Sequence, residues 1–166
     1  RSELLAESIA MLRGSLRENP KAKDVDAVVF TLGNAYLEQE AYETAEAWSR
    51  LSYERFKESR FHSSFEYMVA YALFALKKYE AALAMCNTII ASANPGPSEY
   101  VPQARHMMGQ IFHAMGDVEK ALVSYREVQA SFPDAARAIE YLERQALALT
   151  EVTTVALKDK HEVELE

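Results

Sequence analysis

Apolar residues recur along this chain three and four positions apart, the spacing that places them on one face of a helix. Near the start, one such stripe consists of Leu5, Ile9, Leu12 and Leu16, and near the end, another consists of Ile139, Leu142, Ala146 and Leu149. Charged residues lie between them, as is typical of amphipathic helices that bury one side. The pattern predicts eight helices, over residues 2–18, 24–39, 42–58, 61–77, 79–92, 98–115, 118–131 and 134–149.

A longer pattern occurs three times in the middle of the chain. It starts at a small residue, and the three copies, 37 and 39 residues apart, start at Gly33, Ala70 and Gly109. A large apolar residue follows 3 positions later, at Tyr36, Leu73 and Phe112, and an alanine 12 positions later, at Ala45, Ala82 and Ala121. Small residues on both helices of a pair permit a close antiparallel crossing. The spacing therefore predicts three successive helix pairs.

These copies resemble the signature of the tetratricopeptide repeat (TPR) family, over residues 24–133. The resemblance rests on residues 32–36 (LGNAY) and 42–45 (YETA), and on residues 108–112 (MGQIF), 116–117 (GD), Ala121 and 132–133 (FP). It implies an all-α solenoid of antiparallel helix pairs. The chain departs from the family at Glu40, Ala70 and Lys77, where glycine is usual, and its repeat spacing exceeds the family's 34 residues. We expect Pro133 to end the preceding helix, because proline lacks an N–H.

Two segments break the helical pattern. Residues 93–98 (ANPGPS) are rich in proline and glycine, which predicts a surface loop. Beyond Thr150, polar and apolar residues mix, and residues 161–166 (HEVELE) alternate as in a strand. We therefore expect a TPR-like helical repeat domain over residues 1–149 and a short strand-like or disordered tail over 150–166, either a disordered end or the start of a following β domain. Because the chain begins with Arg1, we expect it to be a piece of a longer polypeptide.

Composition and charge narrow the classes of partner. The net charge of −7 argues against nucleic acid, whose phosphates are neutralised by clustered lysine and arginine. No apolar run reaches the roughly 20 residues that span a bilayer, so we expect no membrane insertion. The single cysteine leaves the redox compartment open. Residues 125–142 are similar to TPR units of bacterial periplasmic and outer-membrane assembly proteins, which favours the periplasm or cell envelope and leaves the cytoplasm open.

Residues with the chemistry for catalysis or metal binding are few and scattered. His106 and His113 are seven residues apart on one predicted helix, too far to share one ion, so we expect no metal. Cys86 falls on a face expected to be buried, which favours an inert thiol. The acidic run of Glu38, Glu40, Glu43 and Glu46 is expected to be a solvated face. We predict no enzymatic activity and no cofactor.

In TPR arrays the first helix of each pair lines a concave channel that binds peptides. Carried over by register, the resemblance implies that the channel positions are Phe30, Asn34, Leu37, Tyr67, Tyr71, Phe74, His106, Gln110 and His113. Each of them is either channel lining or ordinary core, and the pattern alone does not decide between the two. Aromatic, amide and imidazole side chains suit an apolar helix or an extended segment, and not a terminal carboxylate.

These observations lead to three hypotheses. The first is a protein–protein interaction module that binds a peptide or partner domain in an aromatic concave groove. The alternative is a structural spacer or scaffold segment within a larger multidomain envelope protein, and the third is an accessory region of an enzyme whose catalytic residues lie elsewhere. A homodimer through the apolar faces of the terminal helices is a separate expectation.

Overall fold

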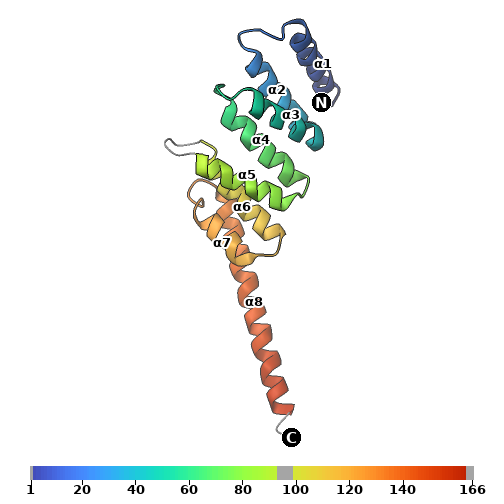
Figure 1. The fold of residues 1–166 in the computed structure, drawn as a ribbon. Helices are drawn as coiled ribbons and strands as arrows, with labels where there is room; N and C mark the ends of the chain where they lie inside the picture. The colour runs from blue at the N-terminus through green and yellow to red at the C-terminus, as the bar shows by residue number, and fades with distance from the viewer. Residues whose placement is uncertain (1, 93–98, 164–166) are drawn as a thin grey trace.

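The computed structural model describes residues 2–92 and 99–163, and they form eight α-helices stacked from one end of the molecule to the other (Figure 1). The helices are α1 (Ser2–Glu18), α2 (Val25–Glu38), α3 (Tyr42–Arg55), α4 (His62–Ala75), α5 (Tyr79–Ser92), α6 (Val101–Ala114), α7 (Val118–Arg126) and α8 (Pro133–Val163). The eight predicted helices and the all-α class are confirmed. The loop predicted at residues 93–98 lies outside the described residues.

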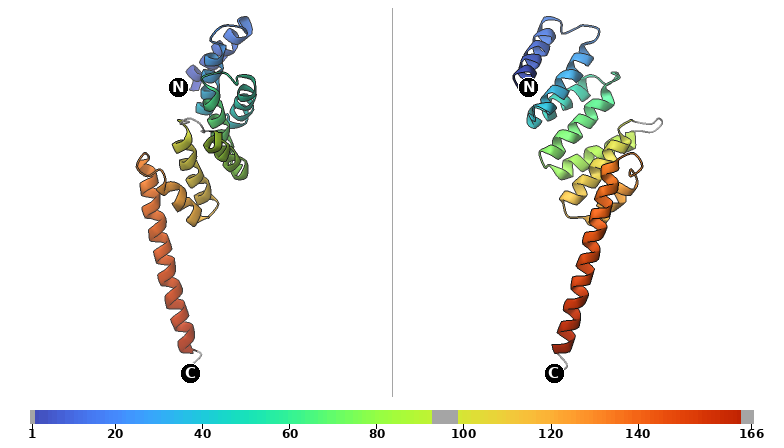
Figure 2. Two further views of the ribbon diagram at one scale, coloured as in Figure 1. Left: turned by 60° about the vertical axis from the view of Figure 1, so that its left-hand side comes forward. Right: turned by 180° about the vertical axis from the view of Figure 1, so that it is seen from behind.

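The helices form antiparallel pairs, α2 with α3, α4 with α5, and α6 with α7, preceded by α1 and followed by α8 (Figure 2). The second helix of each pair packs against the first helix of the next. The first helices also pack directly against one another, α2 against α4 and α4 against α6. They therefore form one continuous face of a TPR-like solenoid.

The same tight turn joins the two helices of each pair. In the first turn the N–H of Ala41 donates to the carbonyl oxygen of Tyr36 at 3.0 Å, and the other turns have the matching bond. The residue before this donor has a positive φ in all three turns, 58° at Glu40 and Lys77 and 80° at Gly116. This arrangement satisfies carbonyl groups at the helix end while it reverses the chain. Glycine adopts such a φ without steric cost, so Glu40 and Lys77 occupy it at an energetic penalty.

Small residues lie where the helices of each pair cross, as the spacing predicted. The alanines at the second-helix position, Ala45, Ala82 and Ala121, are completely buried. On the first helix, a Cβ atom added to Gly109 would lie 2.6 Å from Cδ1 of Tyr125, so only glycine fits there. The second pair has Ala70 and Cys86 at these two positions. The smaller Cys86 leaves room for the methyl group of Ala70, which accounts for this departure from the family pattern.

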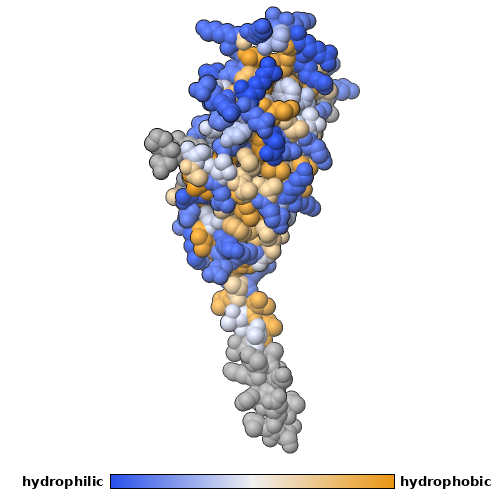
Figure 3. Space-filling model, viewed as in Figure 1, coloured by the Kyte–Doolittle hydropathy of each residue, from blue (hydrophilic) through white to orange (hydrophobic). Residues whose placement is uncertain are grey.

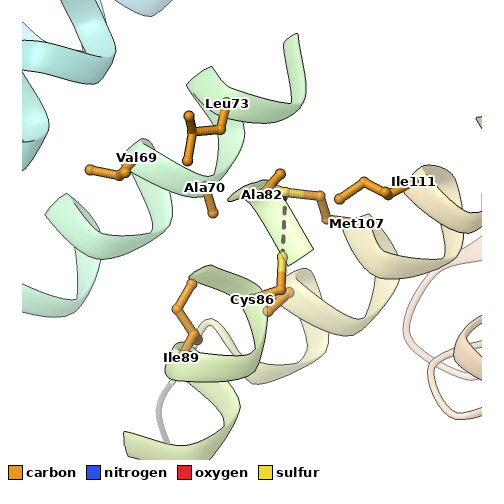
Figure 4. Close-up of a cluster of buried hydrophobic side chains, with 9 residues drawn as sticks. Val69, Ala70, Leu73, Ala82, Cys86, Ile89, Met107 and Ile111 are labelled. Carbon is orange, nitrogen blue, oxygen red and sulfur yellow. Dashed lines mark hydrogen bonds between the residues drawn. The ribbon is translucent and has the colours of Figure 1, made fainter. Parts of the chain in front are cut away.

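The central core joins α4, α5 and α6 (Figure 4). It contains Val69, Leu73, Ile89, Met107 and Ile111, with Cys86 among them. Burying side chains of this size contributes about 1.5–3 kcal/mol each. Similar clusters join α1 to α2 and α3, and α7 to α8, so burial is continuous along the stack.

The expectation that Pro133 ends a helix is wrong. The seventh helix already ends at Arg126, and Pro133 is the first residue of α8. Between them, the N–H of Phe132 donates to the carbonyl oxygen of Val128 at 3.0 Å in a compact turn. The first N–H groups of a helix have no acceptor within the helix, so proline costs nothing at its first position.

The expectation of a strand-like or disordered tail is wrong for residues 150–163, which continue α8. A single alternating segment has no strand to pair with, whereas Val152 follows Leu149 at helical spacing. The hydroxyl of Thr153 donates to the carbonyl oxygen of Leu149 at 2.7 Å, in keeping with a helix. Residues 164–166 lie outside the described residues, and the division into two domains at residue 150 stays a prediction.

The far part of α8 leaves the array and projects away from it (Figures 1 and 2). Leu147, Leu149 and Val152 are exposed on this part, and Leu4 and Met11 are exposed on α1. The expected homodimer through the terminal helices stays a prediction.

Candidate functional site

The nine predicted channel residues lie on α2, α4 and α6, the three first helices that pack side by side. Figure 3 shows apolar side chains gathered along the middle of one face of the array, between hydrophilic margins. Only Tyr71 of the nine is exposed, at 39% of its surface, and the others are half-buried. They fall into three groups by what their side chains contact, and Tyr67 belongs to two of the groups.

Phe30, Tyr67 and His106, which occupy equivalent positions of the three copies, stack on an aromatic ring that precedes the next first helix. Phe30 stacks on Phe61 with ring centroids 4.5 Å apart and an interplanar angle of 11°. The corresponding values are 4.9 Å and 18° for Tyr67 on Tyr100, and 4.6 Å and 5° for His106 on Phe132. These rings therefore contribute to packing between successive pairs.

Asn34, Leu37, Tyr67 and Tyr71 come together around a hollow of about 320 Å³ between α2 and α4. A second hollow, of about 640 Å³, is lined by Leu37 and Tyr71 together with Leu5 of α1 and Tyr42 of α3. Glu38 lines both hollows, while Gln39 and Glu40 line the second. We refer to the two adjoining hollows together as the Tyr71 hollow.

Phe74, Gln110 and His113 do not line the Tyr71 hollow. Phe74 packs against the central core, 6.4 Å from the ring of Tyr79. The ring of His113 lies 6.2 Å from that of Tyr141 on α8. The structure thus brings four of the nine predicted residues together around one hollow.

The rim of the Tyr71 hollow is acidic. Glu38 and Glu40 are exposed, and neither forms an ion pair with any of the described residues. Burial raises the pKa of the Tyr42 phenol, and the nearby Glu40 and Tyr71 raise it further. Glu46, from the same acidic run, instead pairs with Arg50 at 2.6 Å on α3. The run expected to be one solvated face is therefore divided between a hollow and a helix surface.

Leu5, Glu38, Gln39, Glu40 and Tyr42 were not among the residues predicted to line the site. Four of them lie in or next to the turn between α2 and α3, which the nine channel positions carried over by register do not include. Leu5 comes from α1, which packs against α2. The apolar stripe of Leu5, Ile9, Leu12 and Leu16 was the available signal for Leu5, because it predicts that this face of the first helix packs against other residues.

The side chains considered for catalysis or metal binding lie apart from the hollow. Cys86 is completely buried and its thiol donates to Sδ of Met107 at 3.7 Å (Figure 4). Burial raises the pKa of this thiol to about 12, which keeps it protonated at neutral pH. Within the described ranges, no three histidine, cysteine or acidic residues are grouped so that they could hold a metal ion. None of the helices in those ranges is long and apolar enough to cross a membrane.

Residues 103–135 match the family model of the tetratricopeptide repeat. A search of curated proteins finds no match to the sequence. Among solved structures, the MamA RS-1 ArsTM double mutant is similar with a TM-score of 0.67 and 15% identity, over 93% of this chain and 86% of that one. MamA 41-end from Desulfovibrio magneticus RS-1 has a TM-score of 0.61 and 14% identity, over 96% and 95%. MamA MSR-1 C2 has a TM-score of 0.60 and 20% identity, over 90% and 81%.

These similarities extend along nearly the whole chain, but at such low identity they establish only the fold. The register of the three copies, the turn geometry and the buried crossing residues agree with it. The chain therefore has a TPR-like fold along its length, and its residues 103–135 match the family model of the tetratricopeptide repeat.

Proposed function

We propose that this chain is a protein–protein interaction module that holds a segment of a partner protein in the Tyr71 hollow. The proposal is carried by Tyr71 itself, a 39% exposed aromatic side chain that lines both parts of a hollow on the first-helix face. Exposed tyrosines at concave sites are typical of residues that dominate binding energy, because they bury a large area and lose little conformational freedom.

The surrounding residues suit a peptide. Leu37 and Leu5 provide apolar surface, and the Asn34 amide has both donors and acceptors for a peptide backbone. The stack of Tyr67 on Tyr100 holds one wall of the hollow in place before binding. A wall that is already ordered reduces the entropy lost on association. In this proposal the chain binds and does not catalyse.

The proposal is tested by peptide-display selection against the immobilised chain. The Kd of each enriched peptide is then measured by fluorescence anisotropy for the parent chain and for Tyr71→Ala. We expect the substitution to weaken binding about tenfold or more, as truncation of a central interface aromatic does. Circular dichroism checks that the variant remains helical.

Met11→Ala is the matched control, because it truncates an exposed apolar side chain of α1 that does not line the hollow. It should leave the Kd of every enriched peptide unchanged. The proposal is wrong if no peptide is enriched, or if the enriched peptides bind Tyr71→Ala as tightly as they bind the parent chain.

The spacer hypothesis has one observation in its favour, the projection of α8 beyond the array. A helix that leaves its packing partners can connect an array to another unit of the same polypeptide. In that case the Tyr71 hollow would bind no peptide, and the selection described above would enrich none. The same experiment therefore separates the two functions.

A further inference from the structure

We propose that the segment bound in the Tyr71 hollow carries a lysine or arginine next to an apolar side chain. This inference rests on the proposed function and specifies the chemistry of its ligand. It is based on the charge at the rim, the backbone that positions this charge, and the mixed lining of the hollow.

The rim lacks a compensating cation. Glu38 and Glu40 form no ion pair within the part of the chain that the structure describes, and no lysine, arginine or histidine is among the residues that line the hollow. Both carboxylates lie at the carboxyl end of α2, where the helix dipole is also negative. The last turn of α2 contains no basic residue. The carboxylates and the helix end therefore produce a negative potential with no internal counter-charge, which attracts a cation and repels an anion.

The fold does not require an acidic residue in this turn. Glu40 and Lys77 occupy equivalent turns of the first and second pairs, and both have a φ of 58°. The same backbone thus accepts either charge, and it is acidic only in the turn that borders the hollow. The hydrogen bond from Ala41 to Tyr36 fixes this turn, so Glu40 stays beside Tyr42 and Tyr71.

The remaining lining fits the two parts of such a segment. The rings of Tyr71 and Tyr42 can accept a cation against their faces, an interaction that adds to pairing with the carboxylates. Leu5 and Leu37 provide surface for the methylene groups of the basic side chain and for an apolar neighbour. An acidic segment would place like charges beside Glu38 and Glu40, and would be rejected.

Three short fluorescent peptides of equal length test the inference, with Arg–Leu, Gln–Leu or Glu–Leu repeats. Their Kd values are measured by anisotropy for the parent chain, for Glu38→Gln/Glu40→Gln and for Tyr71→Ala. We expect the Arg–Leu peptide to bind most tightly and the Glu–Leu peptide most weakly. The double substitution should weaken Arg–Leu binding about three- to tenfold, as the loss of two exposed ion pairs implies, and leave Gln–Leu binding unchanged.

Glu18→Gln/Glu80→Gln is the matched control, since it removes the same charge from exposed positions away from the hollow. Equal loss of Arg–Leu binding in both double variants would attribute the effect to net charge and overturn the inference. If Gln–Leu peptides bind as tightly as Arg–Leu peptides and lose binding in Tyr71→Ala, the inference fails while the proposed function stands. If no peptide responds to Tyr71→Ala, both fail.

Discussion

The imidazole of His106 lies flat on the ring of Phe132, with centroids 4.6 Å apart and planes within 5° of parallel. His106 belongs to α6, and Phe132 immediately precedes α8, so the contact connects the third pair to the last helix. Equivalent stacks occur at the two earlier junctions, where the partners are phenylalanines or tyrosines. The last junction is therefore the only one of the three whose stack contains a titratable imidazole.

This junction should make stability depend on pH. Burial lowers the pKa of His106 below its ordinary value of 6.5, and the opposing effect of Asp134 is smaller. The unfolded chain then takes up the proton more readily than the folded chain. The stability that neutral His106 contributes is complete above about pH 6.5. It is lost as the pH falls through the lower pKa that His106 has in the folded chain. Urea unfolding of the parent chain and of His106→Tyr, at pH 5 and pH 7.5, measures the difference.

His106→Tyr retains a ring for the stack but does not titrate in this range, so it should lose less stability than the parent chain on acidification. Equal losses in the two proteins would show that the imidazole contributes nothing to the pH dependence. Both proteins contain the same carboxylates, so the comparison cancels the contribution of these groups to the loss of stability at low pH.

Adding a methyl group at the two helix-crossing glycines should have unequal effects. At Gly109 the new Cβ would meet the Tyr125 ring at 2.6 Å, and Gly109→Ala should cost roughly 1–3 kcal/mol of unfolding free energy. At Gly33 the nearest atom is Cε of Met68, at 3.1 Å. This flexible end can move, and alanine favours the helix, so Gly33→Ala should be within about 1 kcal/mol of the parent. Chemical denaturation of both variants provides the comparison, and equal destabilisation would contradict it.

Lys77→Gly should stabilise the array by up to about 1 kcal/mol, because glycine adopts the φ of 58° without steric penalty. The reciprocal change, Gly116→Ala, places a side chain at a φ of 80° and should destabilise by a similar amount. Thermal and urea unfolding measure both. A loss of stability in Lys77→Gly would mean that the lysine side chain makes a contribution larger than the backbone penalty.

Glu66→Gln should raise stability at neutral pH. The Glu66 side chain is 4% exposed and its Oε1 has no hydrogen-bond partner among the described residues, although a hydrogen bond with Ser92 favours the charged form. Burial is the larger effect and raises the pKa of this carboxyl. The stability that protonated Glu66 contributes at low pH is therefore lost as the pH rises through the pKa that Glu66 has in the folded chain.

Glutamine has no charge to desolvate, and the gain from Glu66→Gln should be larger at pH 7.5 than at pH 4.5 by urea unfolding. Glu80→Gln, at an exposed position in the first turn of α5, is the control for the loss of one negative charge. A Glu66→Gln variant less stable than the parent at pH 7.5 would contradict the assignment of a burial cost.

The repeat spacing predicted the helix pairs because their crossing points allow so few side chains. Ala82 and Ala121 are completely buried, so the fold permits only a small side chain at these positions. This restriction can be recognised in the sequence. Pro133 was misassigned because the same ring that prevents continuation of one helix also suits the start of another. The end of α7 at Arg126 has no comparable marker.

The candidate site was predictable only in part. The register placed Asn34, Leu37, Tyr67 and Tyr71 together, since residues on neighbouring first helices follow the stack. It could not show that Phe30 and His106 stack on rings that precede the next helix, because those partners lie 31 and 26 residues away with no fixed spacing. Nor could it place Glu38 and Glu40 on the rim, which depends on the geometry of a turn.

The 31 residues of α8 form a rod about 46 Å long at the usual helical rise, and its first turns are packed against the array. A rotation of about 10° at the junction would displace the far end by about 8 Å, by the geometry of a rigid helix of this length. The ring of Phe132, stacked on His106, lies at the end of α8 that joins the array. Small changes in packing at one imidazole would therefore be amplified into large displacements of the far end of α8.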